Sequence, residues 1–158
     1  MQIKKHLGLV LLIGLMSGCA TTAPELTPME IQSMQTRSFE EEKSIVFGSV
    51  VSVFQDLGYQ IDSADLATGL ITSESPADSV SSWATALTGM RQVTQTRATA
   101  FVEEVGARVN VRLNFLVMNQ LSGGYGQSDR QDQPITDVEI YQNAFERIEN
   151  AIFVRSDA

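Results

Sequence analysis

The chain has only one cysteine, Cys19, and only one histidine, His6. A single cysteine cannot form a disulfide within the chain, so stability has to come from an apolar core. Neither residue type occurs after position 19. The rest of the chain therefore cannot supply a His-based catalytic triad, a zinc site with His or Cys ligands, or a thiol nucleophile.

Basic residues are also few. The chain has 11 lysines and arginines against 19 aspartates and glutamates, and its net charge is −8. A surface of this sign repels phosphate backbones, which disfavours nucleic acid as a partner. Only one lysine, Lys43, lies beyond the first five residues, and it stands beside Glu40 and Glu42. This environment favours a solvated charge over a catalytic base.

The start of the chain has the layout of an export signal. Lys4 and Lys5 precede an apolar run from Leu7 to Met16, and small residues follow. The run has about half of the roughly 20 residues that a helix needs to span a bilayer. The stretch from Leu15 to Ala20, LMSGCA, resembles the lipobox of bacterial lipoproteins.

This resemblance implies that residues 1–18 are a signal peptide and that Cys19 becomes a lipidated N-terminus. Two or three acyl chains would then hold the protein stably on a membrane. In bacteria with two membranes, aspartate after the cysteine often retains a lipoprotein in the inner membrane, and Ala20 occupies that position here. We therefore expect the periplasmic face of the outer membrane, or the plasma membrane if the source has no outer membrane.

The remaining chain is predicted to be a tether followed by one domain. Residues 19–34 carry threonines and prolines without clear periodicity, which is typical of a tether. Residues 35–158 are of a length that suits a single domain. That domain is expected to begin with a short strand over residues 35–39.

Two main helices are predicted from their capping residues and apolar stripes. The first begins at Ser38, which forms a capping box with Glu41, and ends at Gly58. The second is opened by a capping box of Thr136 and Glu139. It carries apolar residues at helical spacing, namely Val138, Tyr141, Ala144, Phe145, Ile148, Ala151 and Ile152.

Two hairpins are predicted, the first from residues 59–63 and 69–74 and the second from residues 91–104 and 107–118. In the second hairpin, apolar and polar residues alternate from Val109 to Val117, so one face is buried. On its first strand, the set of Ala98, Ala100 and Val102 is assigned inward because this choice buries no charge. A long polar loop is expected over residues 119–133.

A short helix is predicted from Ser75 to Gly89, because Pro76 suits the first helical position and Asp78 the first turn. Trp83 and Leu87 lie on its apolar face. They are candidate contacts with a partner protein, since the two longer helices suffice to cover the sheet. The alternative is that Trp83 packs over the sheet.

Together these elements indicate an α+β fold with two layers: an antiparallel sheet with two main helices on one face, plus a short extra helix. The segments QDLGY at 55–59 and GLIT at 69–72 lie between a helix and a strand pair with a C-terminal helix. This pattern resembles envelope lipoprotein modules, including the helix-grip domains of the C lipoprotein of the outer-membrane β-barrel assembly machine. The resemblance implies a fold type and no residue roles.

Carboxylates are the one candidate for catalysis. A glycan hydrolase would need two of them across a cleft. The candidates lie near strand ends and turns, namely Asp62, Asp65, Glu74, Glu103 and Glu104. The GGYG stretch at 123–126 lacks the lysine and the helix start of a phosphate-binding loop. We therefore predict no catalytic residue, no metal site and no cofactor.

Three functions follow as hypotheses. The first is a lipid-anchored, non-catalytic interaction or accessory module of an envelope assembly, with the membrane and envelope proteins as partners. The second is a cell-wall glycan hydrolase using paired carboxylates. The third is a carrier that holds a small apolar ligand in a void lined by Phe54, Phe115 and Phe145. A filled core would favour the first.

Overall fold

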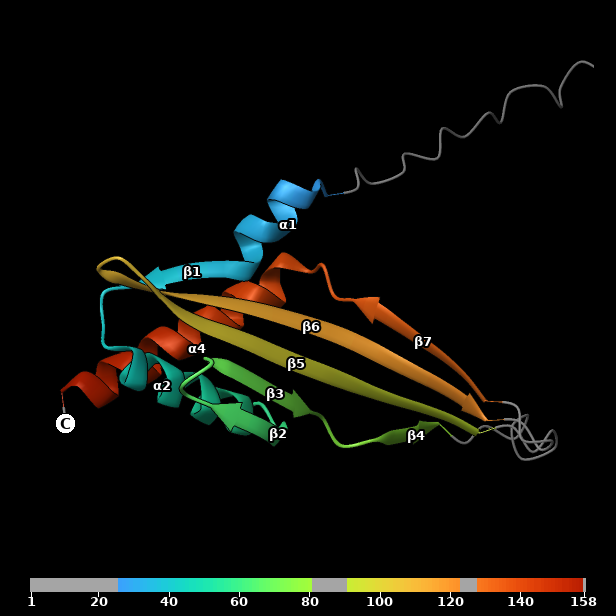
Figure 1. Cartoon of the computed structure of the whole chain (residues 1–158). Helices are drawn as coiled ribbons and strands as arrows, with labels where there is room; N and C mark the ends of the chain where they lie inside the picture. Colours follow the sequence, from blue (N-terminus) through green and yellow to red (C-terminus); the bar gives the residue numbers. More distant parts are fainter. Residues whose placement is uncertain (1–25, 81–90, 123–127, 158) are drawn as a thin grey trace, which may run out of the picture.

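The structure is a computed structural model that describes residues 26–80, 91–122 and 128–157 (Figure 1). In chain order its elements are α1 (Pro28–Gln35), β1 (Thr36–Phe39), α2 (Lys43–Asp56), β2 (Gln60–Asp65), β3 (Leu70–Glu74), β4 (Asp78–Val80), β5 (Arg91–Val105), β6 (Arg108–Ser122), β7 (Ser128–Pro134) and α4 (Val138–Ser156).

Within these described ranges, the strands form one seven-stranded antiparallel sheet. Its central order is β1-β6-β5-β3-β2, while β4 pairs with β5 and β7 pairs with β6. The helices α2 and α4 contact each other and lie on the same side of the sheet (Figure 1). The predicted α+β fold is therefore confirmed.

The core lies between these two helices and the sheet. Helical spacing brings Val46, Val50 and Phe54 of α2 to one face, and all three are fully buried. From the sheet, alternate residues of β5 and β6 enter the core, namely Ala98, Ala100, Val102, Val109, Val111, Leu113 and Phe115. The buried residues of α4 complete the cluster, namely Tyr141, Ala144, Phe145, Ile148 and Ile152.

The long hairpin of β5 and β6 has the predicted faces. Ala98, Ala100 and Val102 are buried, whereas Phe101 is 40% exposed on the opposite face. The register pairs Ala100 with Leu113 without a bulge along the two strands. Because side chains alternate along a strand, this register places the apolar set of both strands against the helices.

Part of the predicted tether is helical, which corrects the expectation for residues 28–34. Thr27 and Glu30 form a reciprocal capping box, and Pro28 stands at the first helical position. The helix α1 contacts β1, β6 and α4. The sequence contains this capping box, but it has no apolar stripe after it that would indicate a helix.

The first main helix begins later than predicted. The expected capping box at Ser38 is absent, because Ser38 belongs to β1 and its hydroxyl lies 2.6 Å from Asn110 Oδ1 on β6. The helix starts at Lys43 with Glu42 as N-cap and no side-chain cap bond. Pairing of β1 with β6 therefore overrides the local capping signal. Gly58 follows the helix at φ 86°, as expected for a helix end.

The N-cap of α4 also lies one residue later than predicted. Asp137 is the N-cap, and its carboxylate accepts a hydrogen bond from the Glu139 backbone N–H at 2.9 Å. The predicted capping box of Thr136 and Glu139 is therefore wrong. Val138, which was expected on the buried stripe, is 39% exposed.

Two segments that were expected to be helix and loop form strands instead. Asp78–Val80 is strand β4, paired with residues 92–94 of β5, so the predicted helix does not begin at Pro76. The polar segment expected as a loop over residues 119–133 contains the end of β6 and most of β7. Ladder hydrogen bonds stabilise these polar strands where apolar burial cannot.

Candidate functional site

Three residues singled out from the sequence lie outside the described part of the structure. These are the expected lipidation site Cys19 and the candidate partner contacts Trp83 and Leu87. The GGYG stretch at 123–126 also lies outside it. Their predicted roles remain expectations.

Of the two candidate carboxylates of β2, Asp65 bonds to the turn that follows the strand. Asp65 Oδ1 accepts a hydrogen bond from the Ala67 backbone N–H at 2.9 Å. This bond, with further hydrogen bonds from Thr68, lowers the pKa of Asp65 below its ordinary value. Asp62 lies on the same exposed edge strand. Asp65 is thus placed as a turn residue, and Asp62 is placed as an edge-strand residue.

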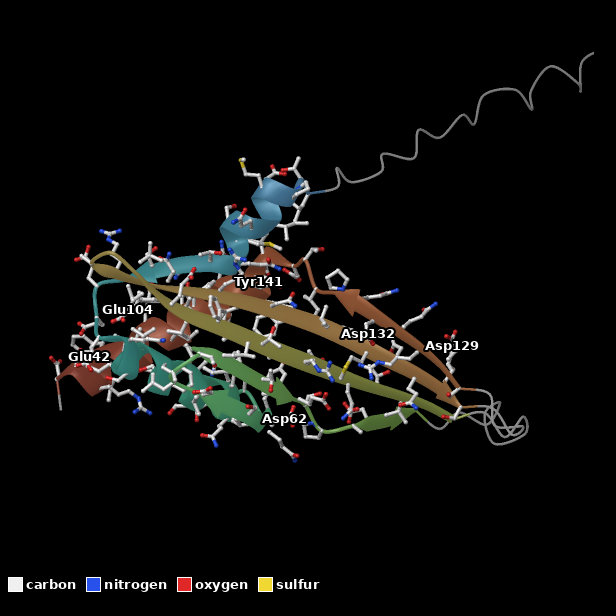
Figure 2. The ribbon with its side chains drawn as sticks, in the orientation of Figure 1. Glu42, Asp62, Glu104, Asp129, Asp132 and Tyr141 are labelled. Carbon is white, nitrogen blue, oxygen red and sulfur yellow. The ribbon has the colours of Figure 1, made fainter. Side chains whose placement is uncertain are left out.

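The other three carboxylates lie on β3 and β5. Glu74 pairs with Arg97 on the neighbouring strand β5. Glu103 and Glu104 stand near the hairpin end of β5, and Figure 2 shows Glu104 and Asp62 well separated. Glu74 lines a small pocket of about 50 Å³, and none of the five candidates lines the two larger pockets described below. The structure thus does not bring two candidates together across a cleft.

The three phenylalanines of the carrier hypothesis belong to the packed core. Phe54, Phe115 and Phe145 are all buried, and the Phe54 and Phe115 ring centroids are 6.3 Å apart. A pocket of about 420 Å³ lies nearby, between the end of α2 and the start of α4. Of the three rings, Phe115 borders this pocket. All three rings thus belong to the core cluster that packs between the helices and the sheet.

The rim of this pocket mixes one aromatic hydroxyl with polar groups of α4. Tyr59 lies at the wall with Asp137, Glu139 and Asn143. Burial raises the pKa of the Tyr59 hydroxyl above its ordinary value, because desolvation disfavours the phenolate. The Tyr59 ring packs against Phe54 and Phe115, at centroid distances of 5.9 and 6.4 Å, so it acts here as a packing residue.

A larger, open groove of about 870 Å³ runs between α2 and α4 on the outside of the helix layer. Arg155 crosses it and donates a hydrogen bond to Ser52 Oγ. Arg147 lines the same groove but donates to Asn143 within α4, and Asp56 supplies the opposite charge. The sequence pattern could not reveal this groove, because the pattern identifies the buried faces of helices and not their outer sides.

The most distinctive surface is formed by strands that run past the helix layer. We define the strand extension as β4, β7, residues 91–97 of β5 and residues 116–122 of β6. Figure 1 shows it reaching beyond both α2 and α4. It contributes no residue to the described core cluster. Every residue of β7 is exposed, and Gln120 and Leu121 of β6 are exposed as well.

Polar contacts hold the strand extension together. Thr94 Oγ1 lies 2.9 Å from Asn119 Oδ1, and Gln95 Nε2 donates to the Ser75 carbonyl at 3.3 Å. On β7, Arg130 Nε donates to Asp132 Oδ1 at 2.9 Å. This bond lowers the pKa of Asp132 and raises that of Arg130, because each charge favours the ionised form of the other.

No protein-family model matches this chain, and no curated protein is significantly similar to it. Among the described helices, none is both long enough and apolar enough to cross a membrane. The functional argument therefore depends on the sequence and on the surfaces described above.

Proposed function

We propose that this protein is a lipid-anchored lipoprotein on the periplasmic face of the outer membrane, where it acts as a non-catalytic interaction or accessory module of an envelope assembly. The lipobox-like stretch ending at Cys19 supports the anchor. The strand extension supports an interaction role.

The strand extension is the observation that carries the proposal. Strands gain stability mainly by burying one face, and this part of the sheet adds no residue to the core cluster under the helices, although its Met118 is buried. Exposed amide side chains, such as Gln120 on β6 and Gln131 on β7, offer hydrogen bonds on an open surface. A surface of this kind suits contact with another macromolecule better than it suits the stability of the domain.

Photocrosslinking in intact cells tests the interaction role. A photoreactive residue replaces Gln120 in the strand extension, and a matched variant replaces Gln142, which is exposed on α4. We expect discrete crosslinked products containing another envelope protein from position 120 and much less from position 142. Equal products from both positions, or products without any envelope protein, would count against this role.

Mass spectrometry of the mature protein tests the anchor. We expect a chain that begins at Cys19 and carries two or three acyl chains. An unmodified Cys19, or a retained segment 1–18, would exclude the anchor without affecting the crosslinking result.

The hydrolase alternative is tested with purified cell wall in a zymogram. We expect no clearing by the wild-type protein, because the candidate carboxylates do not face one another. Clearing that is lost in a folded Glu74→Gln or Glu103→Gln variant would favour the hydrolase.

A further inference from the structure

Strand β7 is an edge strand. It pairs with β6 along one side, and within the described ranges no strand pairs with its other side. All seven of its residues are exposed, and Figure 2 shows Asp129 and Asp132 along it. An edge of this kind presents backbone N–H and C=O groups on which another strand can pair. A partner strand would extend the sheet by one more ladder.

The charges of β7 are arranged about its central residue. Gln131 stands between Arg130 and Asp132 in the strand sequence SDRQDQP. When two copies of β7 pair antiparallel with Gln131 opposite Gln131, Arg130 of each copy lies opposite Asp132 of the other. Directly opposite residues share one face of a sheet and are close enough to interact. The pairing thus sets two cross-strand ion pairs on one face.

The neighbouring registers that keep the same faces together are unfavourable. A pairing centred on Arg130 places two arginines opposite each other, and a pairing centred on Asp132 places two aspartates opposite each other. Like charges directly across a strand pair are destabilising. The charge order therefore selects the register centred on Gln131.

The two charges of β7 already form an ion pair, and Arg130 Nη2 also lies 2.9 Å from Met118 Sδ on β6. Arg130 and Asp132 point to the same face and bond to each other through Nε to Oδ1 at 2.9 Å and Nη2 to Oδ2 at 3.1 Å. A guanidinium has five N–H donors, so its Nη1 group can still donate to a carboxylate of a second copy. The four groups would then alternate in sign around a rectangle.

We propose that β7 is a self-association edge, on which a second copy of this chain pairs antiparallel about Gln131 and joins the two sheets into one. The charge complementarity of Arg130 and Asp132 identifies the occupant as a second copy. The inference uses only β7 and its neighbours, and it depends neither on lipidation nor on envelope partners.

Disulfide trapping tests the register. The full-length chain carries Cys19→Ser in every sample, so that only an introduced cysteine can bridge. Gln131→Cys places the two cysteines directly opposite, within the Cα separation of about 4.4–6.8 Å that a disulfide needs. Gln133→Cys is the matched control on the same face, because its two copies would lie about 13 Å apart along the strands. We expect at least about tenfold more crosslinked dimer from position 131.

Charge reversal tests the ion pairs. Light scattering should detect a dimer for the wild-type chain and a fall in dimer content for Arg130→Asp, which sets aspartates opposite aspartates. The double variant Arg130→Asp with Asp132→Arg restores opposite charges and should restore the dimer. Melting curves check that each variant is folded.

Several outcomes would overturn the proposal. A monomeric wild-type chain without a crosslink at position 131 excludes self-association at this edge. Equal crosslinking at positions 131 and 133 excludes the register. A folded double variant that remains as monomeric as Arg130→Asp excludes the ion pairs as its cause.

Discussion

The backbone carbonyl of Gly69 accepts a hydrogen bond from the Val102 N–H at 2.8 Å, and the two backbones lie in contact at this point. Gly69 has φ 77°, and a Cβ on it would overlap the carbonyl oxygen of Val102. The turn between β2 and β3 is thus packed directly onto β5. Glycine is required here both for its backbone conformation and for space.

Gly69→Ala should therefore destabilise the protein more than the same change at another turn. Gly106 is a suitable control, because it has φ 65° and a Cβ added to it would meet no atom within 4 Å. Gly106→Ala should cost about 1–2 kcal/mol from its left-handed backbone alone. Gly69→Ala should cost about 1–3 kcal/mol more because of the overlap. Chemical denaturation measures both, and equal losses would contradict the contact.

The Tyr141 hydroxyl should contribute to stability through its buried hydrogen bonds. It donates to the Ile135 carbonyl at 3.0 Å and accepts from Gln35 Nε2 at 3.3 Å. Tyr141→Phe should cost about 1–3 kcal/mol of unfolding free energy, because it leaves a carbonyl without its partner. Tyr59→Phe is the control, since no hydrogen bond is found for the Tyr59 hydroxyl among the described residues. Losses of equal size in the two variants would refute this role.

Stability should fall at alkaline pH in a way that depends on Tyr59. Its folded pKa is raised above the ordinary tyrosine value of about 10, because burial disfavours the phenolate. The folded state therefore holds its proton at a pH where the unfolded chain loses it. The contribution is complete below about pH 10 and is lost as pH rises from there through the folded pKa. Denaturation of wild type and Tyr59→Phe at pH 8 to 11 should show a weaker fall in the variant.

Phe54 should be among the most costly residues to truncate. It is fully buried, and its ring contacts Tyr59 and Phe115 at centroid distances of 5.9 and 6.3 Å. Phe54→Ala should cost about 3–5 kcal/mol, because it removes apolar burial and leaves a cavity. Phe153→Ala, at a position 66% exposed on α4, should change stability by less than about 0.5 kcal/mol. A small loss at Phe54 would indicate a loosely packed core.

The sequence predicted those elements whose apolar residues follow a clear period. Val46, Val50 and Phe54 marked α2, and the alternation from Val109 to Phe115 marked β6 together with its buried face. These predictions succeed because the core itself selects the period of each element. A different argument assigned Ala98, Ala100 and Val102 inward: this choice buries no charged side chain.

The predictions failed where pairing between distant strands overrides a local signal. Asp78 read as a first-turn acid of a helix, yet it pairs with Thr94 in the sheet. The residues of β7 carry no apolar pattern, and only the neighbouring β6 makes them a strand. The candidate carboxylates could be named from the sequence, but whether they converge depends on strand register, which residue type does not encode.

The helix α1 shortens the reach of the protein from its proposed membrane anchor. This helix is capped by Thr27, eight residues after Cys19. A chain of that length extends at most about 29 Å. Because Gln35 of α1 also bonds to Tyr141, the helix is fastened to the domain and adds little slack. A lipidated Cys19 would thus confine the domain to a layer only slightly deeper than its own size, and a partner would have to come to the membrane to meet it.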